Sequence, residues 1–125
     1  MFSGFLLAGA GGFLGAGLRY LVYQILAVVA GACGAVWATF SVNILGSFVI
    51  GWLSSIWLLP HHPVRIFVVV GVLGGFTTFS SFSADMFHLL QAGRWGWAAV
   101  YAGGSVCLGL LAALAGFALC GAYLK

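Results

Sequence analysis

Charged side chains are almost absent from this chain, and that scarcity restricts what the chain can fold into. Four of its 125 residues are Lys or Arg, one is Asp or Glu, and 64% are hydrophobic, with a mean hydropathy of +1.22. Soluble domains have about a quarter of their residues charged, so this composition indicates a lipid bilayer as the surroundings. One transmembrane helix needs roughly 20 apolar residues, which leaves room for about four.

Four apolar stretches are separated by short interruptions, so we expect residues 1–125 to form one all-α membrane domain with four transmembrane helices. The stretches cover approximately 2–30, 37–59, 64–91 and 95–123. PHHPVR at 60–65 combines two prolines with charged or titratable groups, and QAGRWGW at 91–97 combines glycine, arginine and two tryptophans; both are typical of connections. The first boundary, between Gln24 and Trp37, is marked mainly by glycines.

Several functions are disfavoured by what the sequence lacks. The net charge of +3 comes from four scattered cations, so we expect no nucleic acid partner. Cys33, Cys107 and Cys120 are odd in number and widely spaced, which indicates buried free thiols rather than disulfides or a metal site. Paired acids, a nucleophile with its base, a metal-ligand cluster and a phosphate loop are all missing, so we do not expect an enzyme.

The stretch at 64–91 is too long for one straight transmembrane helix. It would extend about 40 Å at ~1.5 Å per residue, against a hydrocarbon core near 30 Å. Gly74 and Gly75, halfway along, give the backbone freedom to break, and Thr77 and Thr78 can bond the groups that a break exposes. We therefore predict a discontinuous third helix whose freed carbonyls can bind a cation. A glycine-permitted kink without a ligand is the simpler alternative.

Hydroxyls and aromatic rings alternate directly after the predicted break. Phe79 and Phe82 are three residues apart and therefore face the same side of a helix, next to Ser80, Ser81 and Ser83. Phenylalanines usually indicate core packing. Beside hydroxyl donors, however, the positive edges of the rings can line a path for a small anion.

Other polar side chains can extend that path or simply join helices. The amide of Asn43, central in the second stretch, must be paired in hydrocarbon, either with a neighbouring helix or with an anion. Arg19 can snorkel to the interface, attract anions into a vestibule or pair internally. Asp85, the only carboxylate side chain, can pair with Arg19 or His88. Further hydroxyls that can continue a polar track are those of Thr39, Ser47, Tyr101 and Ser105.

The cations are distributed almost evenly between the two sides of the expected bundle. With four helices, Arg65 and Lys125 fall on one side and Arg94 on the other, while Arg19 lies within or near the end of the first helix. The Lys and Arg bias that normally sets orientation is therefore close to nil. This distribution permits insertion in both orientations, and hence an antiparallel dual-topology dimer; a single orientation is the alternative.

Three motifs resemble those of one family, the Fluc fluoride channels, also called CrcB. GGFLGAGLRY at 11–20 is similar to GGxxGAxxRY, SVNILGSFVIG at 41–51 to VNxxGsFxxG, and LGGFTTFSSFSAD at 73–85 to GGxTTFSTFsxE. The resemblance implies a bacterial inner-membrane homodimer with two antiparallel fluoride pores, passive fluoride export, and a structural sodium ion at its centre. Two positions depart from the pattern, because Ser81 replaces Thr and Asp85 replaces Glu.

The same resemblance assigns roles to individual residues. Phe79 and Phe82 would turn their ring edges toward fluoride, and Asn43 would be the pore amide. Gly74 and Thr77 would supply backbone carbonyls to the sodium ion, one pair from each subunit. The remaining assignments are Ser80, Ser81, Ser83, Thr39, Tyr101 and Ser105 as polar pore residues and Arg19 as the vestibule arginine.

Two rival functions remain open from the sequence. A small dual-topology proton-coupled exporter has a similar length, but it needs a membrane-embedded carboxylate, and the only acid is Asp85, late in the third stretch. A non-transporting scaffold subunit would use every polar residue merely to join helices. Ion flux through the purified protein in liposomes distinguishes the scaffold from a channel.

Overall fold

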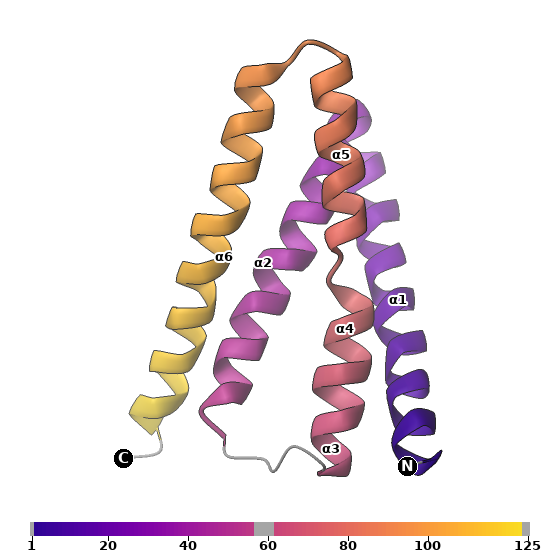
Figure 1. Cartoon of the computed structure of the whole chain (residues 1–125), viewed down its shortest axis with the longest axis vertical. Coiled ribbons are helices and arrows are strands. Elements are labelled where there is room, and N and C mark those ends of the chain that lie inside the picture. The colour runs from indigo at the N-terminus through magenta and orange to yellow at the C-terminus, as the bar shows by residue number, and fades with distance from the viewer. Residues whose placement is uncertain (1, 57–61, 124–125) are drawn as a thin grey trace.

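The computed structural model describes residues 2–56 and 62–123, which form helices joined by short connections (Figure 1). No strand occurs among these residues, in agreement with the predicted all-α fold. The elements in chain order are α1 (Phe2–Ala30), η1 (Gly31–Cys33), α2 (Gly34–Ser54), α3 (Pro63–Arg65), η2 (Ile66–Leu73), α4 (Gly74–Phe76), α5 (Phe79–Gln91) and α6 (Trp95–Tyr123).

The chain reverses direction between α1 and α2 within the three residues of η1. Gly31 has a φ of +54°, a left-handed conformation that favours glycine. Gly34 then brings the start of α2 against the end of α1, because a Cβ here would lie 2.5 Å from the carbonyl oxygen of Leu26 and 2.8 Å from Cα of Ala27. These two glycines therefore make a turn that is shorter than the sequence indicates.

The helix ends lie close to the predicted stretches. α1 and α6 correspond to the stretches at 2–30 and 95–123. α2 begins before the expected residue 37, because the glycine turn needs so few residues, and ends at Ser54. Residues 57–59 of the predicted second stretch lie outside the described residues.

The predicted break in the third stretch is present, but at Thr77 and Thr78 rather than at the glycines. Both threonines have an extended backbone, with ψ values of 156° and 121°, whereas Gly74 and Gly75 are helical. Gly75 serves close packing instead, because a Cβ there would lie 2.5 Å from the carbonyl oxygen of Gly12 in α1.

The segment that precedes the break is wound as a π-helix, which the sequence does not predict. This segment, η2, packs along α1. A Cβ on Gly11 would lie 2.9 Å from Cα of Gly71 in η2, and a Cβ on Gly15 would lie 2.8 Å from the backbone nitrogen of Phe76 in α4, the short helix that follows. Small residues allow this backbone-to-backbone approach between membrane helices. α1 and the half-helix before the break therefore form one tightly packed unit.

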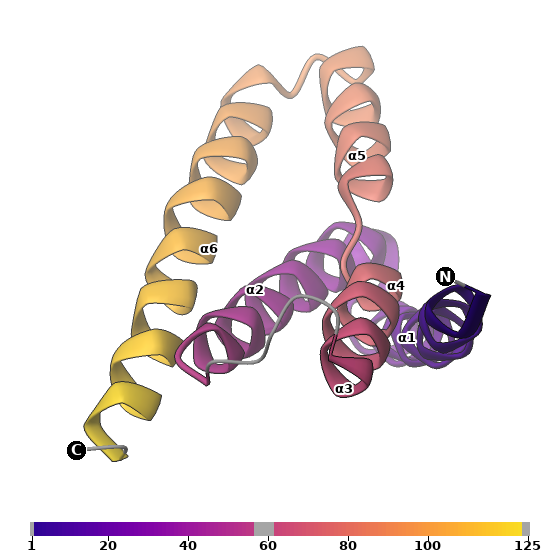
Figure 2. The same ribbon diagram turned by 60° about the horizontal axis from the view of Figure 1, so that its bottom comes forward.

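α2 lies between α6 and α1 in the bundle. It packs along α6 on one side and against α1 on the other, while α5 contacts α6 and α2. After the break, α5 turns away from the direction of α4 and forms an arch with α6, as Figure 2 shows. Before the break the chain packs mainly on α1, and after the break it packs on α6 and α2.

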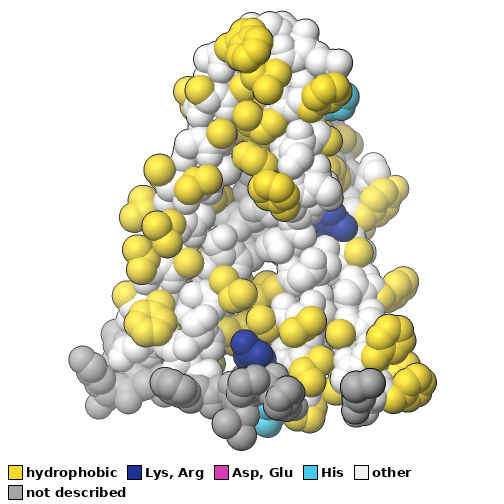
Figure 3. Space-filling model, in the orientation of Figure 1, with side chains coloured by type: hydrophobic (Ala, Val, Ile, Leu, Met, Phe, Trp, Pro, Cys, Tyr) yellow, Lys and Arg dark blue, Asp and Glu magenta, His cyan; other side chains and the backbone are white. Residues whose placement is uncertain are grey.

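The outer surface is that of a membrane protein. Large apolar side chains are widely exposed, with Phe13 at 80% and Val28 at 86%, and apolar groups are spread over the face in Figure 3. Three helical stretches of the described chain are long and apolar enough to cross a bilayer, namely Phe2–Ser54, Pro63–Gln91 and Trp95–Gly121. The chain is therefore a multi-pass membrane protein.

The three cysteines are free thiols, as predicted, but only one of them is buried. Cys120 is buried in α6, whereas Cys33 in the η1 turn and Cys107 on α6 are exposed. The prediction of buried thiols is wrong for these two, because a short turn and an outward helix face place them at the surface of the chain.

Candidate functional site

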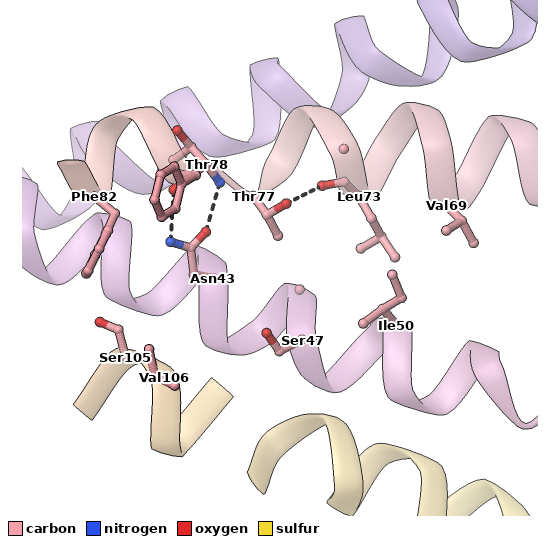
Figure 4. A pocket seen from close by; sticks show the side chains of 13 residues that line it. Asn43, Ser47, Ile50, Val69, Leu73, Thr77, Thr78, Phe82, Ser105 and Val106 are labelled. Carbon is pink, nitrogen blue, oxygen red and sulfur yellow. Dashed lines mark hydrogen bonds between the residues drawn. The ribbon is translucent and has the colours of Figure 1, made fainter. Parts of the chain in front are cut away.

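An open cavity of about 430 Å³ lies at the helix break, between α2, the two halves of the broken helix, and α6 (Figure 4). Six residues to which the sequence resemblance assigns site roles line it: Asn43, Gly74, Thr77, Phe79, Phe82 and Ser105. The rest of its wall consists of Gly46, Ser47, Ile50, Val69, Leu73, Thr78 and Val106. The fold thus brings residues of the second and third motifs and of α6 to one place.

Asn43 joins α2 to the break through both ends of its amide. Its Nδ2 donates to the carbonyl oxygen of Thr78 at 3.0 Å, and its Oδ1 accepts from the Thr78 N–H at 2.8 Å (Figure 4). Thr78 is 7% exposed, so these bonds satisfy the buried backbone N–H that the break removes from the helix and give the carbonyl a partner besides its bond in α5. An amide has two N–H donors, so one remains for a ligand in the cavity.

Thr78 is the central hydroxyl of the break, and it is not among the site residues predicted from the sequence. Its Oγ1 accepts from the N–H of Ser81 at 3.1 Å and so caps the start of α5. The same hydroxyl bonds the side chains of Ser81 at 3.2 Å and Ser80 at 3.1 Å. The spacing of Thr78 and Ser81, three residues apart at a helix start, is the sequence signal that could have identified this cap.

The remaining hydroxyls of the motif bond their own helices. Thr77 donates to the carbonyl oxygen of Leu73 at 2.8 Å, and Ser83, which is exposed, donates to the carbonyl oxygen of Phe79 at 3.0 Å. Neither bond reaches across to another helix. These two hydroxyls therefore stabilise the two sides of the break locally.

Three aromatic rings form a row that begins at the cavity. The ring centroids of Phe79 and Phe82 are 5.8 Å apart, with 34° between their planes. The Phe82 ring lies 5.1 Å from that of Tyr101 on α6, at 40°. Phe79 is 79% exposed in the single chain, so one end of the row is open.

The predicted partners of Asp85 and the predicted place of Tyr101 differ from those in the structure. Asp85 accepts a hydrogen bond from the Tyr101 hydroxyl at 3.0 Å, rather than pairing with Arg19 or His88. Tyr101 is only 7% exposed and does not line the cavity. The reason is the arch of α5 and α6, which turns these two side chains toward each other.

Ser105 and Thr39 have contrasting surroundings. The Ser105 hydroxyl is buried, lines the cavity, and has no hydrogen-bond partner within the described residues. Thr39 is completely buried away from the cavity, where its hydroxyl bonds Tyr23 at 2.6 Å and the carbonyl oxygen of Ala35 at 3.1 Å. Of these two predicted polar positions, only Ser105 lines the cavity.

Arg19 lines a second cavity, of about 320 Å³, together with Ala16, Tyr20, Tyr23, Gln24 and Ser81. Ser81 connects this cavity with the first, because its hydroxyl bonds that of Thr78, which lines the other one. A guanidinium group therefore lies at one end of a chain of hydroxyls that leads to the helix break.

The carbonyl groups of Gly74 and Thr77 are among those that lose their helical hydrogen-bond donors at the break. In a continuous α-helix, the N–H of Thr78 would bond the Gly74 carbonyl and that of Ser81 the Thr77 carbonyl. Here the Thr78 N–H donates to Asn43, and the Ser81 N–H donates to the Thr78 hydroxyl. Carbonyls freed in this way hold Na⁺ in discontinuous membrane helices, so Gly74 and Thr77 fit the predicted ligand type. Among the described residues, no cluster of three His, Cys, Asp or Glu side chains offers another site.

Comparison with known proteins gives a consistent result along the chain. Residues 6–117 match the family described as CrcB-like protein, Camphor Resistance (CrcB). A protein from Thermus thermophilus, named fluoride-specific ion channel FluC, is 48% identical over 122 residues, which cover 94% of this chain and 95% of the relative. Proteins of the same name from Chlorobium phaeobacteroides and Elusimicrobium minutum are 45% and 44% identical, over 91% and 90% of this chain and 89% and 86% of theirs. As its three motifs predict, the chain belongs to the CrcB family.

Proposed function

We propose that this protein is a fluoride-selective ion channel that lets fluoride leave a bacterial cell passively across the inner membrane. The observation that carries the proposal is the wall of the cavity at the break, which combines hydrogen-bond donors and aromatic rings without a carboxylate side chain. Relatives that are 44–48% identical over most of the chain are named fluoride-specific ion channels, which supports the same function.

The donors in the cavity suit an anion that holds water tightly. A selective pore must replace the hydration shell of fluoride with several close partners, because burial without them is costly. Such partners are the second amide N–H of Asn43, the positive ring edges of Phe79 and Phe82, and the hydroxyl of Ser105, which has no partner in the part of the chain that the structure describes. Each is weak by itself, which allows the ion to leave again.

Arg19 and the hydroxyl chain give this cavity a polar approach. An anion attracted by the guanidinium in the second cavity meets the Ser81 hydroxyl there, and then the Thr78 and Ser80 hydroxyls at the start of α5. The approach contains no carboxylate among its lining residues. We therefore place the vestibule at Arg19 and the narrow part of the path at the break.

Four membrane crossings per chain follow from the length of the first stretch. Phe2–Ser54 has 53 residues, which would extend about 80 Å if straight, against a hydrocarbon core near 30 Å. Because the chain reverses at Gly31, α1 and α2 can each cross once. The other two crossings are the broken third helix and α6.

A second copy of the chain completes the cavity in this proposal. Gly74 and Phe79 are exposed in the single chain, although both line the cavity. Charge counts permit insertion in both orientations, and the resemblance to the Fluc family implies an antiparallel homodimer, so we place the second copy antiparallel, with two pores that run in opposite directions.

A structural sodium ion is part of the same proposal. The carbonyls of Gly74 and Thr77 that lack helical donors would be contributed by each subunit, giving four oxygen ligands at the dimer axis. The ion would supply a positive charge that holds the two broken helices together. Its removal therefore weakens the dimer rather than opening one pore.

Ion efflux from liposomes that contain the purified wild-type protein tests this function. We expect rapid fluoride release with chloride retained, at a rate that does not depend on an imposed pH gradient. Fluoride release that requires a pH gradient would instead support a proton-coupled exporter. Folded dimers that move no ion would support the scaffold and overturn the proposal.

A further inference from the structure

Asp85 lies on the helix face that carries the two phenylalanines of the cavity, yet it does not line the cavity. Phe79, Phe82 and Asp85 follow one another at intervals of three residues along α5, which places them on one side of the helix. The Asp85 carboxylate accepts a hydrogen bond from Tyr101 at 3.0 Å. This bond gives Asp85 a structural connection to the cavity through Tyr101.

Tyr101 transmits this contact through its ring. The ring is held between Asp85, which bonds its hydroxyl, and Phe82, whose centroid is 5.1 Å away. Phe82 in turn packs 5.8 Å from Phe79. The row of rings is thus fixed at its α6 end by a hydrogen bond and is open at the other end, where Phe79 is exposed.

We propose that Asp85 is a positioning residue for fluoride conduction, because its bond to Tyr101 fixes the ring against which Phe82 packs. This inference rests on the proposed fluoride-channel function. Two torsion angles define the place of a tyrosine ring, so holding the hydroxyl also holds the ring plane. The tilt of Phe82 matters because the edge of an aromatic ring attracts an anion, whereas its face repels one.

A carboxylate close to an anion path could act in the opposite way, through its charge. In that case Asp85 would repel fluoride, and neutralising it would accelerate conduction. The positioning role depends on the acceptor oxygen instead, which Asn retains and Ala lacks. The two roles therefore predict different results for the same pair of variants.

Fluoride efflux from liposomes should be compared for Asp85→Ala, Asp85→Asn, Tyr101→Phe and the double variant Asp85→Ala with Tyr101→Phe. We expect Asp85→Ala and Tyr101→Phe each to slow efflux about tenfold, as the loss of one strong hydrogen bond implies. Asp85→Asn should stay within about twofold of wild type, and the double variant should be no slower than either single variant. Ser54→Ala, which removes an exposed hydroxyl bonded to its own helix, is the matched control.

A measurement that does not need transport separates this inference from the channel proposal. 4-Fluorophenylalanine at position 82 reports the ring current of Tyr101 in its ¹⁹F chemical shift. We expect Asp85→Ala to move this resonance and Asp85→Asn to leave it in place, even if the wild-type protein moves no fluoride.

Four results would overturn the positioning role. Two concern single variants: efflux through Asp85→Ala that equals or exceeds wild type, and efflux through Asp85→Asn that is as slow as through Asp85→Ala. The third is an additive loss of efflux in the double variant. The fourth is an unchanged ¹⁹F resonance in Asp85→Ala. If Asp85→Ala fails to assemble, Asp85→Asn and Tyr101→Phe still decide the question, because they alter at most one hydrogen-bonding group each. Slow efflux with Tyr101→Phe and normal efflux with Asp85→Asn is then the expected pair.

Discussion

Among the described residues, Asn43 is the only side chain that bonds both the backbone N–H and the backbone C=O of a residue at the break, and Asn43→Ala removes it. Both bonds go to Thr78, which is 7% exposed, so its backbone N–H would be left unpaired, while its carbonyl, at the N-cap of α5, would keep only its helical bond. A buried group without its partner costs about 1–3 kcal/mol, whereas interhelical hydrogen bonds in membranes average ~0.6 kcal/mol. For two bonds we expect Asn43→Ala to lower the free energy of unfolding by about 1–4 kcal/mol.

SDS titration in mixed micelles, followed by the fluorescence of the five tryptophans, measures this free energy. Ser47→Ala is a suitable control, because Ser47 lies one turn further along α2 and lines the same cavity. We expect the control to change stability by less than about 0.5 kcal/mol. A loss for Asn43→Ala that is no larger than that of the control would refute the conclusion that this amide holds the break.

Three further changes have defined outcomes. Gly75→Ala should destabilise the protein, because its Cβ would lie 2.5 Å from the backbone oxygen of Gly12. Gly17→Ala, whose Cβ would have no atom within 4 Å, should be neutral or stabilising by about 0.5–1 kcal/mol. Thermal unfolding of both variants would show the difference, and equal effects would contradict the packing argument. Ser105→Ala should leave stability unchanged or raise it, since the buried hydroxyl has no partner within the described residues; clear destabilisation in the same unfolding assay would mean that this hydroxyl is bonded in the folded protein. Exchange of Na⁺ for a large organic cation should weaken the dimer in size-exclusion chromatography, and an unaltered dimer would argue against the structural sodium ion.

The helices could be predicted from the sequence because lipid imposes a simple rule on composition. Apolar stretches of sufficient length must be helical in a membrane, so α1 and α6 lie where the stretches at 2–30 and 95–123 predict them. The start of α2 differs, because the turn depends on the positive φ of Gly31 and on the close contact of Gly34 with α1. Such contacts depend on the three-dimensional packing of two helices.

The position of the break could not be predicted from its glycines alone. Glycine permits a break, but Gly75 is needed for contact with α1, and the extended residues are Thr77 and Thr78. The amide of Asn43 makes this position favourable by bonding the backbone that the break exposes. Local sequence can show that a segment is able to break, whereas a partner on another helix decides where it does.

The candidate site was predictable as a set of residues, but the hydrogen-bond partners were not. Spacing places Phe79 and Phe82 together, and both line the cavity. The partner of Asp85 is Tyr101, which depends on how α5 and α6 meet after the break. Thr39 is likewise removed from the cavity by its bond to Tyr23, a contact between α1 and α2. Long-range helix packing determines these pairs.

Passage of fluoride through the cavity at the helix break is the central claim. Fluoride efflux through Phe79→Ile, compared with Phe87→Ile in liposomes of equal protein content, tests it most directly, because Phe87 is an exposed phenylalanine of the same helix that does not line the cavity. We predict that Phe79→Ile abolishes or greatly slows efflux while Phe87→Ile conducts like wild type. Wild-type efflux through a well-folded Phe79→Ile dimer would contradict the claim.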